Sequence, residues 1–500
     1  MLYSSTRDKS IKIKSAEAIK TGLSKDGGLF VPETLPVLSA SEIESLVTMS
    51  YNDRAISILS KFLTDFDLFE IKECVDLAYN KERFETENIA PVYKLNDSVY
   101  FLELWHGPTC AFKDMALQIL PHLLTKSMQK CGSDKECVIL VATSGDTGKA
   151  ALEGFKDVDK TRIFVFYPER GVSEMQKLQM ITQEGNNVGV AAVVGNFDDA
   201  QTGVKKIFTN KDYAQTLALN GFELSSANSI NWGRLVPQIV YYFSAYADLV
   251  KSGEIKLGDK INFAVPTGNF GNILAGYYAK KMGLYVNKFI CASNENNVLT
   301  EFINTGVYDR ERKFHTTISP SMDILVSSNL ERLLYDLTDG NDELVKEYMT
   351  SLSTDGKYSV SADILEKIQD NFYAQCCDDD ATMQTIKAVN DEYSYVMDTH
   401  TAVGKNVYDK YAEATGDNTK TVIASTASPF KFNQSVLIAL EGLSSVAGKN
   451  EFELLELLAQ KSNMRIPKSL AELRTKAHLF DISCDKKQMQ QVVSEFLKVE

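Results

Sequence analysis

The stretch Cys137-Val-Ile-Leu-Val-Ala-Thr-Ser-Gly-Asp-Thr-Gly-Lys149 decides the fold class of this chain. It begins with an unbroken apolar run, residues 137–142, which has the length of a buried strand. A turn of small polar residues follows, and residues 149–155 then have helical character. A strand without polar alternation is typical of a parallel sheet that helices cover on both faces. The stretch therefore predicts an α/β fold.

The same order of apolar run, small polar turn and helix recurs later in the chain. Residues 261–265 form a second run, and the turn Pro266-Thr-Gly-Asn-Phe-Gly-Asn272 precedes the helix-like residues 273–282. Further apolar runs of strand length occupy residues 162–167, 288–293 and 421–425. Strands that alternate with helices predict open, mostly parallel sheets. Ligands of such sheets bind beyond the carboxyl ends of the strands, which is where these polar turns fall.

The first ninety residues differ from this pattern, because helices are expected at residues 41–47 and 54–63 after a Gly- and Pro-containing stretch. We expect three parts: a mainly helical N-terminal domain at residues 1–90, an α/β core of two subdomains at 91–435, and a mainly helical segment at 436–500 that packs on the core.

Residues 300–396 give the weakest prediction. They are charged and mixed, so the sequence does not fix their layout. Within them, Gln375-Cys-Cys-Asp-Asp-Asp380 is predicted to be a surface loop, because it combines paired cysteines with an acidic triplet.

Composition excludes several classes of protein. The 500 residues carry 67 acidic and 53 basic side chains, a formal charge of −14, so we expect no nucleic-acid partner. No apolar run reaches the length of a membrane span, and we expect the N-terminus to be that of a mature protein, neither a signal nor a transit peptide. Eight scattered cysteines indicate reduced thiols, and five dispersed histidines predict no metal site. We predict a cytoplasmic protein without membrane contact.

Two Gly-containing turns are candidate anion sites. Residues 143–149 resemble a P-loop superficially, but two residues rather than four separate Gly145 from Gly148. Such a turn either binds an anion at a helix N-terminus or is a plain turn in which Ser or Thr caps the helix. Gly268-Asn-Phe-Gly-Asn272 has the same placement and the same two interpretations. Two such turns in one protein favour a site for two anionic groups.

The stretch Trp105-His-Gly-Pro-Thr-Cys-Ala-Phe-Lys-Asp114 places one lysine, Lys113, among small and apolar residues before a helix-like run. Desolvation disfavours an ammonium and frees a reactive amine. Most lysines are solvated surface charges, however. Asp114 could also pair with Lys113, which would raise the pKa of the lysine, or it could cap the next helix.

Together these segments resemble the threonine synthase family, whose members are pyridoxal-phosphate enzymes of fold type II. Two small departures are Cys110, where an aliphatic residue is expected, and Ser428, where some members carry histidine. The likeness follows the order of the chain and rests on Tyr3-Ser-Ser-Thr-Arg7, Asp26-Gly-Gly-Leu-Phe-Val-Pro-Glu33, His106-Gly-Pro-Thr109, Ala111-Phe-Lys-Asp114, Ala142-Thr-Ser-Gly-Asp-Thr-Gly148, Ser226-Ala-Asn-Ser-Ile-Asn231, Pro266-Thr-Gly-Asn-Phe-Gly-Asn272, His400-Thr-Ala-Val403 and Thr426-Ala-Ser-Pro429.

The resemblance implies two open, mostly parallel subdomains with pyridoxal 5'-phosphate in the cleft between them. Lys113 matches the catalytic lysine that forms a Schiff base with the cofactor, and Thr426 matches the hydroxyl residue at its pyridine nitrogen. The residues that match the cofactor's phosphate loop are Gly268, Asn269, Phe270, Gly271 and Asn272. Those expected to face the substrate are Thr109, Ser144, Gly145, Asp146, Thr147, Asn228, Ser229, Arg234 and, more weakly, His400.

The implied reaction converts O-phospho-L-homoserine and water into L-threonine and phosphate by γ-elimination and β-addition of water, the last step of threonine biosynthesis. It would explain two anion-binding turns, because cofactor and substrate each carry a phosphate. Two alternatives stay open: a threonine-synthase-like phospholyase and a catalytically inactive binding homologue. We expect a monomer or a weak homo-oligomer.

Overall fold

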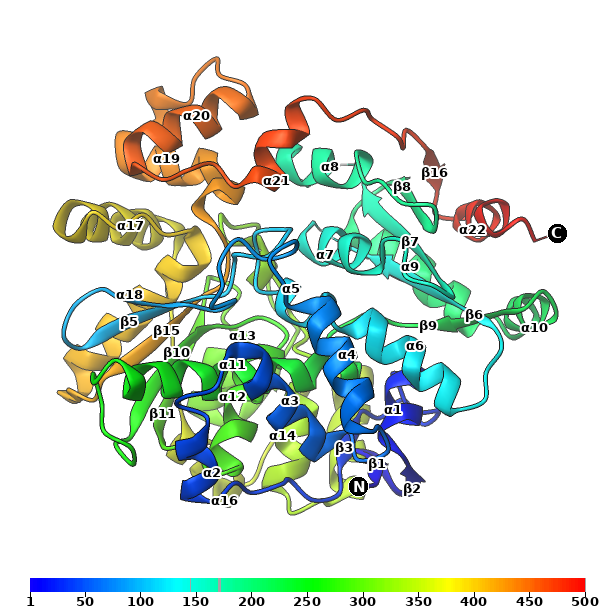
Figure 1. Ribbon diagram of the computed structural model, residues 1–500, viewed down its shortest axis with the longest axis horizontal. Helices are drawn as coiled ribbons and strands as arrows, with labels where there is room; N and C mark the ends of the chain where they lie inside the picture. The colour runs from blue at the N-terminus through cyan, green and yellow to red at the C-terminus, as the bar shows by residue number, and fades with distance from the viewer. Residues whose placement is uncertain (144, 170–171, 500) are drawn as a thin grey trace.

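The computed structural model describes residues 1–143, 145–169 and 172–499. Two separate sheets with their surrounding helices form the body of the molecule (Figure 1). The larger sheet has six strands in the order β14-β11-β10-β15-β5-β4, and all neighbours are parallel except β4, which runs antiparallel to β5. These strands are β14 (Phe372–Cys376), β11 (Val286–Ser293), β10 (Ile261–Pro266), β15 (Thr421–Ser425), β5 (Val99–Glu103) and β4 (Val92–Lys94).

The smaller sheet has five strands, all parallel, in the order β16-β8-β7-β6-β9. Its strands are β16 (Ser483–Asp485), β8 (Val188–Val194), β7 (Thr161–Pro168), β6 (Glu136–Ala142) and β9 (Phe222–Ser225). The predicted α/β class with two mostly parallel sheets is confirmed. The apolar runs that predicted β6, β7, β10, β11 and β15 each form a strand, and all lie in one of these two sheets.

The helix α11 (Trp232–Lys251) lies at the centre of the fold and is buried along nearly its whole length. It packs against α12 (Gly271–Lys281), α3 (Tyr51–Phe62) and α5 (Asp114–Leu117). Most of its residues are apolar, as expected of a helix in a protein core. The helices of the smaller sheet are α6 (Leu120–Lys130), α7 (Asp146–Phe155), α8 (Glu174–Ile181), α9 (Phe197–Thr209) and α10 (Lys211–Leu219).

The N-terminal unit is helical as predicted, but it also contains a three-stranded antiparallel sheet that the sequence pattern does not reveal. Tyr3 of this sheet packs edge-on against Trp232 of α11, and the guanidinium of Arg54 on α3 lies 2.7 Å from the Asp248 carboxylate. The elements besides α3 are β1 (Tyr3–Ser5), β2 (Asp8–Ile13), β3 (Phe30–Pro32), α1 (Ser15–Thr21), α2 (Ala40–Ser45) and α4 (Leu68–Ala78).

The stretch at residues 300–396 forms a short antiparallel ribbon and several helices beside the larger sheet. The predicted surface loop at residues 375–380 is wrong: Cys376 ends β14, Cys377 is buried, and α17 begins at Asp379. The elements are α13 (Val298–Thr305), β12 (Val307–Asp309), η1 (Pro320–Met322), α14 (Leu330–Leu337), α15 (Asp342–Thr354), β13 (Lys357–Ser359), α16 (Ala362–Asn371) and α17 (Asp379–Tyr393). The helix α18 (Thr399–Thr415) follows this stretch.

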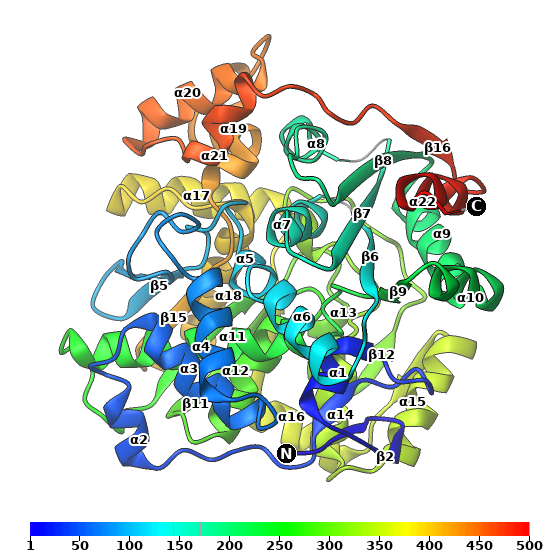
Figure 2. The ribbon, with the colours of Figure 1, turned by 45° about the vertical axis from the view of Figure 1, so that its right-hand side comes forward.

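The C-terminal segment is mainly helical, and it also adds one strand to the smaller sheet. After α21 the chain runs extended over the molecule to β16, which pairs with β8 (Figure 2). The division of the chain near residues 90 and 435 stays a prediction. The elements are η2 (Pro429–Phe432), α19 (Asn433–Glu441), η3 (Leu443–Ser445), α20 (Glu451–Ser462), α21 (Lys468–Ala471), η4 (Glu472–Arg474) and α22 (Met489–Leu497).

Among the described residues, none of the helices is both long and apolar enough to cross a bilayer. The same residues hold no cluster of three acidic, histidine or cysteine side chains suited to a metal ion.

Candidate active site

Lys113 lies at the N-terminus of α5 with only 9% of its surface exposed. Its Nζ atom lies 3.3 Å from the hydroxyl of Ser321 and 3.6 Å from Oδ2 of Asp146. Burial lowers the pKa of this amine to about 8, although Asp146 opposes the shift. Desolvation therefore leaves Lys113 with a sizeable fraction of free amine near neutral pH.

Asp114 neither pairs with Lys113 nor caps the following helix. Its carboxylate accepts hydrogen bonds from the main-chain N–H and the hydroxyl of Thr109, both at 2.8 Å. Burial raises the pKa of this carboxyl to about 6, while the bonds from Thr109 lower it. A Cβ atom on Gly107 would lie 2.6 Å from the Asp114 carboxylate, so glycine is required where the loop passes over it.

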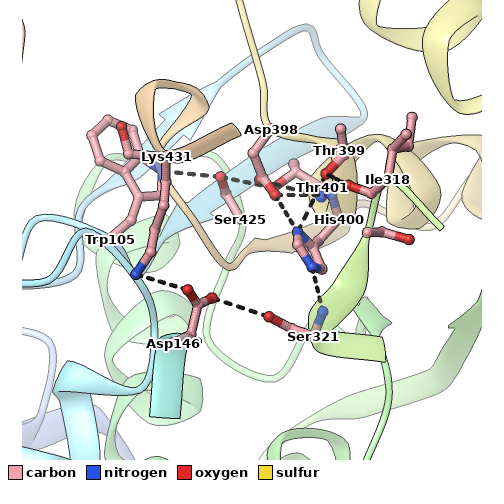
Figure 3. A network of polar contacts seen from close by, with 12 residues as sticks. Trp105, Asp146, Ile318, Ser321, Asp398, Thr399, His400, Thr401, Ser425 and Lys431 are labelled. Carbon is pink, nitrogen blue, oxygen red and sulfur yellow. Dashed lines mark hydrogen bonds and ion pairs between the residues drawn. The ribbon is translucent and has the colours of Figure 1, made fainter. Parts of the chain in front are cut away.

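Asp146, the first residue of α7, lies close to both Lys113 and Lys431. Its Oδ1 atom lies 2.9 Å from Nζ of Lys431, and Oδ2 accepts from Ser321 at 3.0 Å (Figure 3). Oδ1 also accepts a hydrogen bond from Gln176. Burial alone would raise the pKa of this carboxyl, but Lys431 and Lys113 hold it well below its usual range. Asp146 is therefore a buried carboxylate between two lysines.

Thr143 caps the turn before α7 with its own side chain. The hydroxyl of Thr143 accepts hydrogen bonds from the N–H groups of Gly145 and Gly148, as one of the two interpretations of this turn requires. Gly145 has φ of +145°, and a Cβ atom there would meet the Gln176 side chain at 2.3 Å. Thr147 is half-buried. Ser144 lies outside the described residues.

The loop Gly268–Asn272 joins β10 to α12 and leaves a buried donor at the start of the helix. Oδ1 of Asn272 accepts from the hydroxyls of Tyr241 and Tyr242, at 2.6 and 2.7 Å, which fixes the orientation of the amide. Nδ2 of Asn272 is buried and has no hydrogen-bond partner among the described residues. A buried donor at a helix N-terminus fits a phosphate group.

Two residues that sequence reasoning missed hold this loop in place. Asn329 donates from its backbone and side chain to the carbonyl of Asn269, and its side chain also donates to the carbonyl of Ser229. Arg332 in turn donates to Oδ1 of Asn329 and to the carbonyl of Ile230. The segment at residues 228–234 and the loop at 268–272 are therefore joined through α14 and its N-cap.

Arg234 is a buried cation that is bound to a backbone carbonyl. It is 6% exposed, and its guanidinium donates one hydrogen bond, to the carbonyl of Ala227. Burial lowers its pKa to about 10. Among the described residues no carboxylate forms an ion pair with it, so an anionic ligand would complete its contacts. Asn228 is exposed, and Ser229 is half-buried.

His400 is buried and held by hydrogen bonds at both ring nitrogens. Nε2 accepts from the backbone N–H of Ser321 at 3.1 Å, so Nδ1 carries the hydrogen and donates to Asp398 at 2.9 Å (Figure 3). Because His400 contacts the backbone of Ser321 rather than its hydroxyl, these residues do not form a Ser-His-Asp triad. His400 instead positions the segment that brings Ser321 to Lys113.

Thr426 lies just beyond β15 and beside the loop that carries Lys113. Its carbonyl accepts from the N–H of Phe112, and Ala427 forms a β-bridge with Ala111. The structure thus gathers Lys113, Asp146, Arg234, His400, Thr426 and the loop 268–272 from elements of both sheets and α11. The residues missed by sequence reasoning are Gln176, Ser321, Asn329, Arg332 and Lys431.

Three family models match consecutive parts of the chain. The threonine synthase N terminus matches residues 2–79, the pyridoxal-phosphate dependent enzyme model matches residues 84–426, and the threonine synthase C-terminal model matches residues 401–493.

Individual proteins agree with these models. Threonine synthase-like 1 of Homo sapiens is 44% identical over 437 residues, and the match covers 85% of this chain but only 58% of that protein. Threonine synthase of Saccharomyces cerevisiae is 36% identical over 496 residues, with 93% and 94% of the two chains covered. The pyridoxal-phosphate-bound threonine synthase structure from Brucella melitensis aligns over 100% of this chain and 99% of its own, with 34% identity and a TM-score of 0.87. The chain belongs to the threonine synthase family of pyridoxal-phosphate-dependent enzymes.

Proposed function

We propose that this protein is a threonine synthase that uses pyridoxal phosphate to convert O-phospho-L-homoserine and water into L-threonine and phosphate. The observation that carries the proposal is a reactive amine, Lys113, accompanied by two incomplete anion sites. One is Nδ2 of Asn272 at the start of α12, and the other is the guanidinium of Arg234; in the described part of the chain the first has no hydrogen-bond partner and the second no acidic partner. A cofactor phosphate and an anionic group of the substrate would complete them.

The residues present fit the cofactor. Lys113 would attach it, the N–H groups of Gly271 and Asn272 with the Asn272 amide would bind its phosphate, and the Thr426 hydroxyl would face its ring nitrogen. When bound, pyridoxal phosphate supplies an electron sink that stabilises negative charge beside the substrate's amino group.

The chain itself would orient the substrate and move protons. Arg234 would bind an anionic group of the substrate, because a buried guanidinium gains most from a charged partner. The Nζ atom of Lys113, with a pKa of about 8, would accept and return a proton near neutral pH. His400 would keep Ser321 against Lys113 by binding its backbone N–H.

Two residues expected to contact the substrate have other partners. The N–H and hydroxyl of Thr109 are bound to Asp114, and its carbonyl accepts from Lys431. Asp146 is a carboxylate and would repel a dianionic substrate. We propose structural and electrostatic roles for these two residues, while substrate contacts of Ser144, Gly145, Thr147, Asn228 and Ser229 stay predictions. So do the cytoplasmic location and the monomeric or weakly oligomeric state.

A phospholyase is the alternative, because threonine synthase-like 1 proteins are among the relatives at 43–44% identity. The test is incubation of the cofactor-loaded protein with O-phospho-L-homoserine, followed by chromatography of the products. Threonine and phosphate in equal amounts support the proposal. Ketobutyrate with phosphate and no threonine would identify a phospholyase, and an unchanged substrate would identify a binding homologue.

A further inference from the structure

Lys431 is a second lysine at the site, and its side chain has no exposed surface. It lies in η2, directly after β15 of the larger sheet. Its Nζ atom lies 2.9 Å from Oδ1 of Asp146 and donates to the carbonyl of Thr109 at 2.8 Å. A buried ammonium is costly unless it is paired and hydrogen-bonded, so its position requires a partner such as Asp146.

Asp146 faces both lysines at once. Oδ1 contacts Lys431, and Oδ2 accepts from Ser321 (Figure 3). Oδ2 also lies 3.6 Å from Nζ of Lys113. The shorter and fully buried contact belongs to Lys431. The carboxylate therefore interacts more strongly with Lys431 than with Lys113.

The charges around Lys113 come from three elements. Asp146 on α7 is the negative group, and Lys431 on η2 and Arg234 on α11 are positive; His400 on α18 reaches only the backbone of Ser321. If Lys431 were absent, Asp146 would be a full countercharge for Lys113 alone. That arrangement would favour the ammonium form, which cannot attack a carbonyl.

We propose that Lys431 is a positioning residue that neutralises Asp146 and so leaves the Lys113 amine free to react. The inference rests on the proposed function, in which Lys113 attaches the cofactor. Asp146 then orients Lys113 through Ser321 and its own Oδ2 atom without holding it as an ammonium. This pairing also connects η2, which follows the larger sheet, to α7 of the smaller sheet, directly at the reactive amine.

Lys149 shows what a buried lysine without this role looks like. It lies on the same helix as Asp146, and its ammonium pairs with Glu153 at 3.0 Å. It also donates to the side chain of Gln183. Replacement of Lys149 therefore controls for the loss of a buried lysine as such.

The experiment compares Lys431→Met, Lys431→Arg, Asp146→Asn, the Lys431→Met/Asp146→Asn double variant and Lys149→Met. Each cofactor-free protein is mixed with pyridoxal phosphate, and the pH midpoint for growth of the absorbance band is measured. We expect Lys431→Met to raise the midpoint by about one pH unit and Asp146→Asn to lower it, since the single charges act in opposite directions. Lys431→Arg, the double variant and Lys149→Met are expected to stay close to the unmodified protein.

A merely structural Lys431 would lower the melting temperature of Lys431→Met and leave the midpoint unchanged, which would overturn the inference. If Lys431→Met does not fold, a midpoint in Asp146→Asn equal to that of the unmodified protein overturns it as well. If the unmodified protein forms no band, the proposed function fails. Competitive acetylation of Lys113, followed by peptide mass spectrometry, then measures the titration of this amine without cofactor. Opposite shifts in Lys431→Met and Asp146→Asn support the inference. Equal titration in these variants and the unmodified protein refutes it.

Discussion

Asp114 accepts hydrogen bonds from both the main-chain N–H and the hydroxyl of Thr109, each at 2.8 Å. These bonds close the loop that leads into Lys113, and a Cβ atom on Gly107 would obstruct it. The acid beside the lysine therefore does not trap the amine as an ammonium. The Asp114 carboxylate instead holds the backbone of the loop that carries Lys113, because it accepts hydrogen bonds from the N–H and hydroxyl of Thr109.

Replacing Asp114 by alanine is expected to lower the free energy of unfolding by about 2 kcal/mol, because two buried donors of Thr109 lose their acceptor. Urea denaturation measures the change. Thr109→Ser keeps both donors and serves as the control, with a loss below about 1 kcal/mol. Equal stability of Asp114→Ala and the unmodified protein would show that the hydrogen bonds between Thr109 and Asp114 do not hold the loop.

The rate at which Lys113 attaches pyridoxal phosphate should depend steeply on pH. With a pKa of about 8, the free amine fraction rises about tenfold between pH 7 and pH 9 and levels off above that. This pKa lies below the value of 10.5 for an ordinary lysine, so the folded cofactor-free protein also gains stability as the pH rises between those two values. Stopped-flow absorbance measures the rate, and Lys113→Ala is the blank. A flat profile from pH 7 to 9 contradicts the assignment.

Asn272→Asp tests the phosphate site with a nearly isosteric change. The acceptor oxygen for Tyr241 and Tyr242 is kept, while Nδ2 becomes a second carboxylate oxygen. We expect the affinity for pyridoxal phosphate to fall about tenfold or more, because the new carboxylate repels the phosphate and the Nδ2 donor is lost. Dialysis followed by absorbance measures retention. Asn406→Asp on α18, which adds the same charge beside Thr385, should retain the cofactor fully.

The central strands could be predicted because their local signals agree with their tertiary environment. β6 and β10 are mainly apolar and are followed by Gly-containing turns, and both have parallel neighbours on each side. The strands β3 and β16 have three residues each, and they pair with β1 and β8, which lie far from them in the sequence. No local pattern distinguishes such short strands from loops.

The error at residues 375–380 has a specific physical cause. Asp378 is the N-cap of α17, and its side chain accepts from the N–H of Ala381. Asp379 and Asp380 occupy the first turn, where acidic side chains stabilise the helix dipole. The acidic triplet is therefore a helix start signal, and its charge alone suggested an exposed loop.

The site followed from sequence only where the chemistry lies in a motif. Lys113 lies in the motif at residues 105–114, and the loop 268–272 is itself a Gly-containing turn. Lys431 lies between Phe430 and Phe432, and no local pattern indicates its partner. Lys431 and Asp146 are 285 positions apart in the sequence, and the fold brings η2 and α7 close enough for their 2.9 Å ion pair. Ser321 likewise reaches the site from a stretch whose layout the sequence could not predict.

Arg234→Gln is expected to reduce kcat/KM for O-phospho-L-homoserine about 100-fold or more, mainly through KM, because a buried charged partner of an anion is lost. Steady-state kinetics with chromatographic detection of threonine measures the effect. Arg162→Gln removes a half-buried arginine that pairs with Glu136 in the smaller sheet, and it should leave KM unchanged. An unaltered KM in Arg234→Gln would place the substrate's anionic group elsewhere.

Arg332 should stabilise the fold and the phosphate site together. Its guanidinium is fully buried and donates to the carbonyl of Phe30 in β3, to Oδ1 of Asn329 and to the carbonyl of Ile230. Arg332→Met leaves these acceptors unpaired, so the free energy of unfolding is expected to fall by about 3 kcal/mol. Because Asn329 binds the carbonyl of Asn269, the variant should also lose pyridoxal phosphate faster on dialysis. Arg310→Met removes an arginine that pairs with the exposed side chain of Glu311, and it is the control for removing an arginine. Lower stability with undiminished cofactor retention would show that Arg332 anchors the N-terminal unit but does not support the loop.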